Sequence, residues 1–423
     1  MYSRMRLALI GGAKTAINNL NFLRRYGFEV ELTTRSVLEV REEGEIVGTV
    51  RHNSKTPAQD LEPTREYMQK RASETKDSVM ADWLVTIQDD PQREPAKYRW
   101  FGNAMWRMLL DRLPLEGLKP RLVVERDWSS FSTVLIWGDH HCDVWSLMQH
   151  LNQNDIWEGS SWRLKRGVGL VFTGDYGDRG FLGLEVNFII WTAWANNPDQ
   201  VVVLAGNHED PNTYSVHGRD FDETMRAQLR KQGGLEPELD ATALKEDVQR
   251  VHSVLPCAVL FKWRNNKRVQ CNHGGFPFGR NNEKKRSPVV LEAGVVSEKV
   301  QHALLWGDFA VGDYLIARGQ RGPNSQQVGT RGCAAYMKAN KLDLSVSGHQ
   351  HFFPARSALQ GTRLDADRQL YLVGKKLKWS DGPLHVVTSA ASYLIEDRTG
   401  KPTAAYVRLR EDDFIEIVTT TRR

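Results

Sequence analysis

The sequence lacks three features that mark particular classes of protein: long apolar runs, closely spaced cysteines and a strong excess of one charge. No run approaches the ~18 uninterrupted apolar residues of a membrane span, so no membrane partner is expected. The four cysteines form no C-x-x-C pair, which favours reduced thiols in a cytoplasmic protein over a disulfide framework. A net charge of +5 suits an anionic substrate, but the clustered Lys and Arg of a nucleic-acid-binding protein are missing.

The N-terminal segment is basic, because no acidic residue precedes Glu29. Organelle transit peptides share this composition, but a folded β-α-β start is the preferred interpretation. Arg6–Ile10 is typical of a strand, Ala13–Arg25 of a helix and Phe28–Thr33 of a second strand. The turn after the first strand lacks the G-x-G-x-x-G spacing of dinucleotide-binding proteins, so a Rossmann-like structural unit is expected rather than a nucleotide site.

A domain boundary is predicted near residue 125. Residues 51–80 are polar and charged and are expected to form a solvated loop or an exposed helix. A helical pattern at Asn103–Leu113 is followed by Pro114, Gly117 and Pro120, which interrupt regular structure. We therefore divide the chain into an N-terminal α/β extension, residues 1–125, and a second domain, residues 126–423.

Short apolar runs recur in the second domain, and each ends at Gly, Asp, Asn or His. These runs, each typical of a buried strand, are Thr133–Trp137, Gly169–Thr173, Val201–Ala205, Arg268–Cys271 and Leu344–Ser347. Helical patterns lie between them at Cys142–Gln153, Phe181–Asn196 and Ala334–Asn340, so an α/β domain is expected. Ligands in such folds gather at the carboxyl ends of the strands, where these polar residues fall.

The polar residues that follow the strands form a mixed nitrogen and oxygen donor set. A glycine permits a sharp turn at a strand end, and the next side chain can then project over the edge of the sheet. The candidate ligands are Asp139, His141, Asp175, Asn207, His273, His349 and His351. Such a set is large enough to hold two metal ions.

The segments around these residues resemble, in order, the motifs of the calcineurin-like metallophosphoesterases, and among them the serine/threonine protein phosphatases. G-D-H-H at 138–141, G-D-Y-G-D-R-G at 174–180 and G-N-H-E at 206–209 are similar to the family's G-D-x-H, G-D-x-x-D-R-G and G-N-H-E. H-G-G at 273–275, L-L-W-G-D at 304–308, G-H-Q-H at 348–351 and S-A-A-S-Y at 389–393 continue the resemblance. It covers roughly residues 132–420 and implies a β-sandwich flanked by helices.

The resemblance also implies how the donor set is divided. One metal would be held by Asp139, His141 and Asp175, with His351 completing the site as in the wider superfamily. The second would be held by Asp175, Asn207, His273 and His349, so that Asp175 bridges the two ions. The number of histidines favours Mn, Fe or Zn over Mg or Ca.

Three further residues receive catalytic roles from the same resemblance. His208 would protonate the leaving alkoxide, Asp178 would orient that imidazole, and Arg179 would bind phosphate oxygens in a bidentate way. The family's second phosphate-binding arginine has no clear match here, and Arg331 is preferred over Arg318 and Arg321. Tyr393 is a further candidate for contact with the substrate. The remaining isolated histidines are interpreted as surface or core residues: His150, His217, His252, His302 and His385.

Three functions stay open at this point. The leading one is a metal-dependent phosphomonoesterase that acts on phosphoprotein. A nucleotidase, a dinucleoside polyphosphate hydrolase or a nuclease could use the same metal core with a different substrate pocket. A regulatory binding protein with a nucleotide-fold module at its N-terminus is the third, although the complete ligand set argues against it.

Overall fold

The computed structural model contains one large α/β unit and a small N-terminal sheet. It describes residues 29–34, 37–42, 45–51, 109–158, 162–177, 183–210, 237–280, 286–310, 312–319, 325–350, 376–381, 383–388, 390, 403–412 and 414–421. The predicted strand Arg6–Ile10, the predicted helix Ala13–Arg25 and the polar segment 52–80 lie outside these residues.

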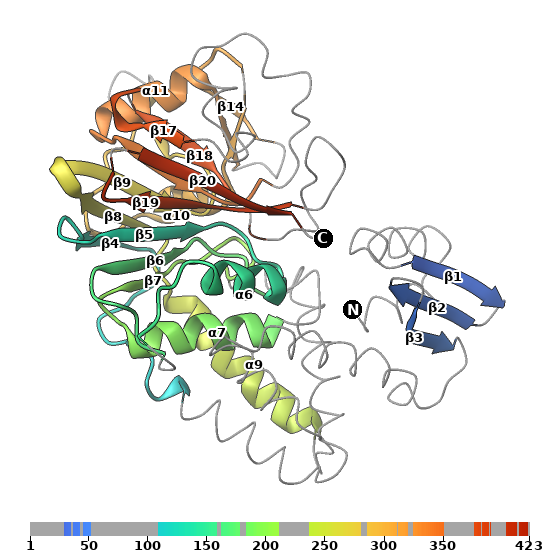
Figure 1. Ribbon diagram of the computed structural model, residues 1–423. Helices are drawn as coiled ribbons and strands as arrows, with labels where there is room; N and C mark the ends of the chain where they lie inside the picture. Colours follow the sequence, from blue (N-terminus) through green and yellow to red (C-terminus); the bar gives the residue numbers. More distant parts are fainter. Residues whose placement is uncertain are drawn as a thin grey trace.

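Two six-stranded mixed sheets form the centre of the large unit (Figure 1). The first sheet has the order β17 (Lys376–Lys378), β20 (Phe414–Thr421), β19 (Thr403–Arg410), β5 (Thr133–Trp137), β6 (Val168–Phe172) and β7 (Val201–Val203). The second has the order β12 (Gly294–Val295), β4 (Leu122–Asp127), β8 (Ala258–Trp263), β9 (Lys267–Asn272), β16 (Leu344–Ser347) and β18 (Leu384–Val387). Strands β5, β6 and β7 are parallel to one another, as are β9, β16 and β18.

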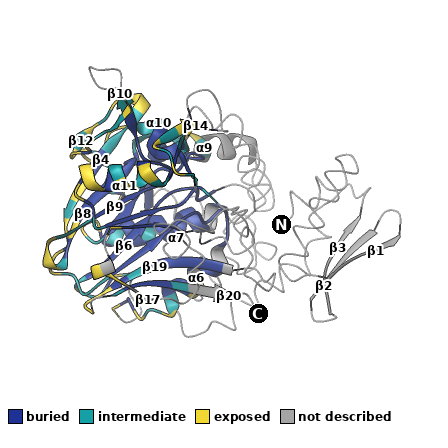
Figure 2. Ribbon diagram, turned by 90° about the horizontal axis from the view of Figure 1, so that it is seen from above, coloured by how far each residue is buried: buried dark blue, intermediate teal, exposed yellow. Residues whose placement is uncertain are grey.

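The two sheets pack face to face as a β-sandwich. Val134 and Ile136 of β5 belong to the same buried cluster as Val259 and Phe261 of β8. Their neighbours Leu135 and Trp137 point to the opposite face, because successive side chains of a strand alternate. Burial is densest on these central strands (Figure 2). The expected α/β sandwich flanked by helices is therefore confirmed.

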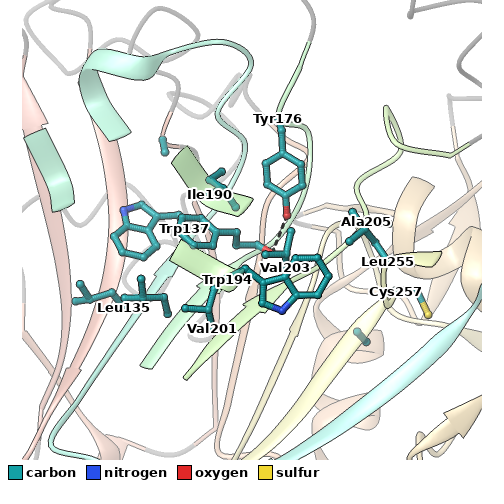
Figure 3. Packing of buried hydrophobic residues seen from close by; sticks show 14 of the residues in the cluster. Leu135, Trp137, Tyr176, Ile190, Trp194, Val201, Val203, Ala205, Leu255 and Cys257 are labelled. Carbon is teal, nitrogen blue, oxygen red and sulfur yellow. Dashed lines mark hydrogen bonds between the residues drawn. The ribbon is translucent and has the colours of Figure 1, made fainter. Parts of the chain in front are cut away.

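Helices cover the outer faces of the sandwich. Their bounds are α6 (Val144–Asn152), α7 (Gly183–Asn196), α9 (Pro237–Val254), α10 (Glu298–Trp306) and α11 (Thr330–Ala339). Helices α6 and α7 lie along β5, β6 and β7, and α9 packs against α7, where His252 contacts Trp191 (Figure 1). Ile190 and Trp194 of α7 pack in one cluster with Trp137 and Val203, as Figure 3 shows. Tyr176 closes this cluster, and its hydroxyl donates to the carbonyl of Leu204 at 2.6 Å.

The predicted strands and helices of the second domain agree closely with the structure. Strands β5 and β16 have the predicted bounds, and β6, β7 and β9 overlap their predictions. Helices α6, α7 and α11 overlap the three helical patterns. Helix α9, the hairpin of β10 (Phe278–Arg280) and β11 (Arg286–Pro288), and the sheet of β13 (Asp308–Phe309), β15 (Gln326–Val328) and β14 (Ile316–Arg318) were not predicted.

Near the N-terminus, β1 (Glu29–Thr34), β2 (Val37–Glu42) and β3 (Glu45–Arg51) form an antiparallel sheet. Strand β1 coincides with the predicted Phe28–Thr33 apart from one residue at each end. The Rossmann-like start stays a prediction, since its first strand and helix fall outside the described residues. The division at residue 125 also stays a prediction, and it falls within β4. Among the described residues, no helix combines the length and apolarity needed to span a membrane.

Candidate metal centre

Five strand ends deliver the candidate ligands to one buried place. Asp139, Asp175 and Asn207 follow β5, β6 and β7 of the first sheet, whereas His273 and His349 follow β9 and β16 of the second. The two sheets meet here, because the backbone N–H of His349 donates to Asp139 Oδ1 at 2.7 Å. All five side chains, together with that of His141, are almost completely buried.

A carboxylate oxygen of Asp175 lies at the centre of this group. Its Oδ2 atom is 3.3 Å from Nε2 of His141, 3.3 Å from Nε2 of His273 and 3.7 Å from Nε2 of His208. The oxygen is buried, and no described residue donates a well-aligned hydrogen bond to it. Buried polar atoms in native proteins are satisfied as a rule, so an oxygen surrounded by imidazole nitrogens is what a cation site requires.

His273 faces a second set of donor atoms. Its Nε2 atom is 2.9 Å from Asn207 Oδ1 and 3.1 Å from Nδ1 of His349. Its other nitrogen, Nδ1, is 3.0 Å from the carbonyl oxygen of Thr173. A carbonyl only accepts hydrogen bonds, so Nδ1 carries a proton and Nε2 is the nitrogen that faces the site. A ligating histidine is usually oriented in this way.

The donor atoms form two groups that share Asp175. Ligand atoms of Asp175, His273 and His349 all lie within 4.8 Å of one another, and so do those of Asp175, His141 and His208. Asp139 borders both groups, with Oδ2 at 4.0 Å from Nε2 of His141 and Oδ1 at 3.6 Å from Nδ1 of His273. The geometry could therefore hold two cations, with the carboxylate of Asp175 between them.

The backbone at these strand ends is unusual and tightly packed. Asp175 and His349 have φ angles of 57° and 71°, in the left-handed region that residues other than glycine rarely adopt. Glycines beside them make the turns possible: a Cβ atom on Gly206 would overlap Oδ1 of Asp175, and one on Gly348 would overlap Oδ1 of Asp139. Strained residues of this kind concentrate at functional sites.

Opposing charges decide the protonation of the central residues. Burial by itself would raise the pKa of Asp175, but His208 and His273 outweigh burial and hold that pKa well below its usual value. Burial would lower the pKa of His273, but Asp175 and Asp139 raise it. The pKa of Asp139 is raised, chiefly by burial. The carboxylate of Asp175 thus keeps its negative charge in a buried place where the nearby imidazoles favour it.

Glu209 organises the backbone behind Asp175. Its carboxylate accepts hydrogen bonds from the backbone N–H groups of Asp175, Tyr176 and Gly206 at 2.7, 3.0 and 2.8 Å. Burial and the neighbouring Asp175 raise the pKa of Glu209 to about 7. In the sequence, Glu209 is the last residue of the G-N-H-E motif. The motif identified the residue, but the backbone groups that it binds depend on the packing of β6 against β7.

The structure brings together six of the seven predicted ligands, namely Asp139, His141, Asp175, Asn207, His273 and His349, and places His208 beside them. Asp178, Arg179, His351 and Tyr393 lie outside the described residues, so their roles stay predictions. Arg331 is exposed on α11, where its Nε atom is 3.4 Å from Asp313 Oδ1. No described contact joins Arg331 to the six ligands, and its role in phosphate binding stays a prediction.

The sequence did not single out two other residues of the site. Asp308 lies at the start of β13 with Oδ1 at 3.8 Å from Nε2 of His349, and the carbonyl of Thr173 orients His273. The L-L-W-G-D segment pointed to Asp308 only as part of a family pattern. Thr173 acts through its backbone, so its side chain gave no signal.

Comparison with known proteins agrees with this geometry. A region of the chain is 26% identical over 189 residues, 43% of the chain, to serine/threonine-protein phosphatase BSL2 of Arabidopsis thaliana. The matches span 17 to 43% of the length of the curated relatives. A protein serine/threonine phosphatase from Saccharomyces cerevisiae, described as similar to human phosphatase PP5, superimposes with a TM-score of 0.50 at 16% identity. The alignment covers 77% of this chain and 90% of that one, which supports the fold.

The sequence model of the calcineurin-like phosphoesterases matches residues 132–353, just over half of the chain. That region contains all five strand ends of the candidate centre. The chain therefore belongs to the calcineurin-like phosphoesterase family.

Proposed function

We propose that this chain is a dinuclear metal-dependent phosphoesterase that hydrolyses phosphate monoesters, with phosphoserine or phosphothreonine of a protein as its substrate. The convergence of donor atoms around Oδ2 of Asp175 is the observation that carries the proposal. The named relatives, which are serine/threonine phosphatases, support this substrate class.

The donor atoms fit a pair of divalent ions. Asp139, His141 and Asp175 would hold one ion, and Asp175, Asn207, His273 and His349 would hold the other. The fit rests on the buried Oδ2 atom of Asp175, to which no described residue donates a well-aligned hydrogen bond, and on the mixture of imidazole, amide and carboxylate donors. This mixture favours Mn, Fe or Zn. Bound ions of this kind supply Lewis acidity that polarises phosphoryl oxygens and activates water near neutral pH.

We assign His208 the role of general acid, which its contacts and exposure support. Its backbone N–H donates to Oδ1 of Asp175 at 3.0 Å, which ties the residue to the centre. It is 8% exposed, whereas the six proposed ligands are 0 to 2% exposed, so it is the most accessible member of the group. An imidazole at the accessible edge can hand a proton to the oxygen of the departing alcohol.

The remaining steps belong to residues outside the described part of the chain. We retain Asp178 as the group that orients the His208 imidazole and Arg179 as the group that binds phosphate oxygens. Their support is the G-D-x-x-D-R-G pattern, which begins with the central Asp175.

A substrate panel with metal removal tests the proposal. Purified protein loaded with Mn, Fe or Zn should hydrolyse p-nitrophenyl phosphate and phosphoserine peptides, and should lose this activity after chelation and regain it when metal returns. Bis(p-nitrophenyl) phosphate and diadenosine tetraphosphate should be poorer substrates. Preference for either of these would favour the nuclease or nucleotide hydrolase alternative, and activity that survives chelation would refute the proposed function.

A further inference from the structure

Three buried side chains, those of Tyr336, Gln270 and Asn272, form a hydrogen-bonded network beside His273. Asn272, the last residue of β9, is fully buried, and its Nδ2 atom donates to the carbonyls of Gly274 and Gly275 at 2.8 and 3.1 Å. Its Oδ1 atom accepts from Nε2 of Gln270 at 2.8 Å. The side chain therefore spans the turn that carries His273.

The direction of each hydrogen bond in this network is fixed. The carbonyls of Gly274 and Gly275 only accept, so Asn272 must turn Nδ2 toward them and Oδ1 toward Gln270. Gln270 must then donate from Nε2, which leaves its Oε1 to accept from the hydroxyl of Tyr336 on α11 at 3.2 Å. The amide of Asn272 thus has one satisfactory orientation.

The same amide reaches the end of helix α10. Nδ2 of Asn272 lies 3.4 Å from the carbonyl of Leu304, which also accepts the backbone N–H of Gly274 at 2.5 Å. Carbonyls in the last turn of a helix have no intrahelical partner, so the turn after β9 supplies one. The chain continues from α10 through Gly307 to Asp308, whose Oδ1 is 3.8 Å from Nε2 of His349.

The turn at His273–Gly275 packs closely against the backbone at the end of α10. A Cβ atom on Gly274 would lie 2.7 Å from the carbonyl carbon of Leu305, and one on Gly275 would lie 2.9 Å from the carbonyl carbon of Gly307. Backbone therefore packs directly on backbone. The hydrogen bonds of Asn272 hold the turn in this packed arrangement.

We propose that Asn272 is a positioning residue that fixes the turn at His273–Gly275, with Gln270 and Tyr336 fixing its amide, so that Nε2 of His273 faces the second metal position. The inference rests on the proposed dinuclear function. Groups that orient a metal ligand typically contribute 10- to 100-fold in metal affinity or activity. A buried amide that served only the fold would contribute to stability alone.

Asn272→Ala removes the amide and tests the inference. We expect the affinity for the second Mn²⁺ ion, measured by calorimetry on the full chain, to fall about 10- to 100-fold. At limiting Mn²⁺, kcat should fall by a similar factor with KM nearly unchanged, and excess Mn²⁺ should restore part of it. Asn272→Asp should behave alike, because a carboxylate oxygen would replace the donor that faces the carbonyls.

Asn197→Ala is the matched control. Asn197 is also a buried amide that bridges backbone groups: its Nδ2 donates to the carbonyls of Trp162 and Ala193, and its Oδ1 accepts the N–H of Leu164, all at 2.8 Å. It precedes β7, at the opposite end of that strand from Asn207. We expect it to lower the Tm while Mn²⁺ affinity and kcat stay at wild-type values.

The outcomes separate the inference from the proposed function. If the wild-type protein binds no pair of ions or hydrolyses no phosphate ester, the proposed function fails first. If the wild-type protein does both, but Asn272→Ala loses only Tm as Asn197→Ala does, the positioning role is wrong. Should Asn272→Ala not fold, Tyr336→Phe removes only the far hydroxyl, and we expect a few-fold loss of Mn²⁺ affinity. Unchanged affinity in that variant would contradict the proposed role of the network from Tyr336 to His273.

Discussion

Asp175 contacts more of the site than its role as a single ligand requires. Its backbone N–H is held by Glu209, its Oδ1 atom accepts the N–H of His208, and its Oδ2 atom faces the imidazoles of His141 and His273. The left-handed backbone of Asp175 costs free energy that these contacts must offset. The contacts therefore fix both oxygens relative to both proposed metal positions.

His208→Asn tests the role of the general acid. Asparagine keeps the backbone N–H that reaches Asp175 and can still donate a hydrogen bond, but it cannot transfer a proton. We expect kcat on phosphoserine peptides to fall about 10²- to 10⁴-fold, with a smaller loss on p-nitrophenyl phosphate, whose leaving group needs no proton. Steady-state kinetics on the two substrates measures the difference.

Metal content distinguishes this role from ligation. Nε2 of His208 lies close enough to His141 and Asp175 to complete a metal-binding group itself. If His208 is the general acid, elemental analysis should find two ions per chain in both the wild-type protein and His208→Asn. A loss of one ion in the variant would instead assign His208 as a ligand.

At this scale the sequence could identify ligands but not what orients them. Asp139, Asp175, Asn207, His273 and His349 were predictable because each follows an apolar run and carries a metal-binding side chain. Glu209 and Asn272 act on backbone groups of other segments, so their partners depend on tertiary packing. The orientation of His273 by the carbonyl of Thr173 leaves no trace in side-chain chemistry.

At the scale of elements, the end of each strand matters more than its middle. Strands β5, β6, β7, β9 and β16 were predicted because each short buried run ends at a Gly, Asp, Asn or His, whereas the apolar runs of β4, β8, β18, β19 and β20 lack that ending and were not predicted. Helix α9 was not predicted: among its described residues Val248, Val251 and His252 are buried, and charged residues separate them from the earlier apolar residues of the helix. Strands β13, β14 and β15 have two or three residues each and are too short to show a periodic pattern.

Gly348→Ala tests the importance of close packing at a strand end. The added methyl group would overlap Oδ1 of Asp139 and lie 3.1 Å from Oγ1 of Thr173, so the carboxylate must move. We expect at least a ten-fold loss of kcat, because small displacements of catalytic groups are costly, together with a destabilisation of about 1–3 kcal/mol. Kinetics and thermal unfolding measure the two effects.

Gly279→Ala is the control for that substitution. Its added methyl group would meet only a side-chain carbon of Val289, at an ordinary contact distance of 3.7 Å. Activity and Tm should stay close to those of the wild-type protein. Equal activity in both variants would show that the space beside Asp139 is not needed.

At the scale of the whole molecule, the site exists because two sheets bring their strand ends together. The sequence indicates which segments end in ligands, but not that β5, β6 and β7 join one sheet while β9 and β16 join another. That pairing depends on long-range contacts between inner faces, such as those of Ile136 with the second sheet. The division at residue 125 and a cytoplasmic location stay predictions.

Buried histidines in the core predict that the fold is sensitive to acid. Burial lowers the pKa of His150, His252 and His385 from 6.5 to about 3. Below pH 6.5 the unfolded chain binds protons that the folded chain excludes, so stability decreases as pH falls. Each histidine contributes about 1.4 kcal/mol per pH unit, and the three together about 4 kcal/mol per pH unit. Since a domain is stable by about 5–15 kcal/mol, unfolding is expected near pH 5.

Chemical denaturation between pH 4.5 and 7.5, with chelator present to remove the pH dependence of metal binding, measures this slope. His385→Leu supplies the comparison, because neither ring nitrogen of His385 bonds to a described residue and the ring packs against Phe276 and Phe309. The variant should lose about 1.4 kcal/mol per pH unit of the slope below pH 6.5, since one excluded proton is gone. A slope equal to that of the wild-type protein would mean that His385 takes up its proton without unfolding, and that the core admits water or charge at this position.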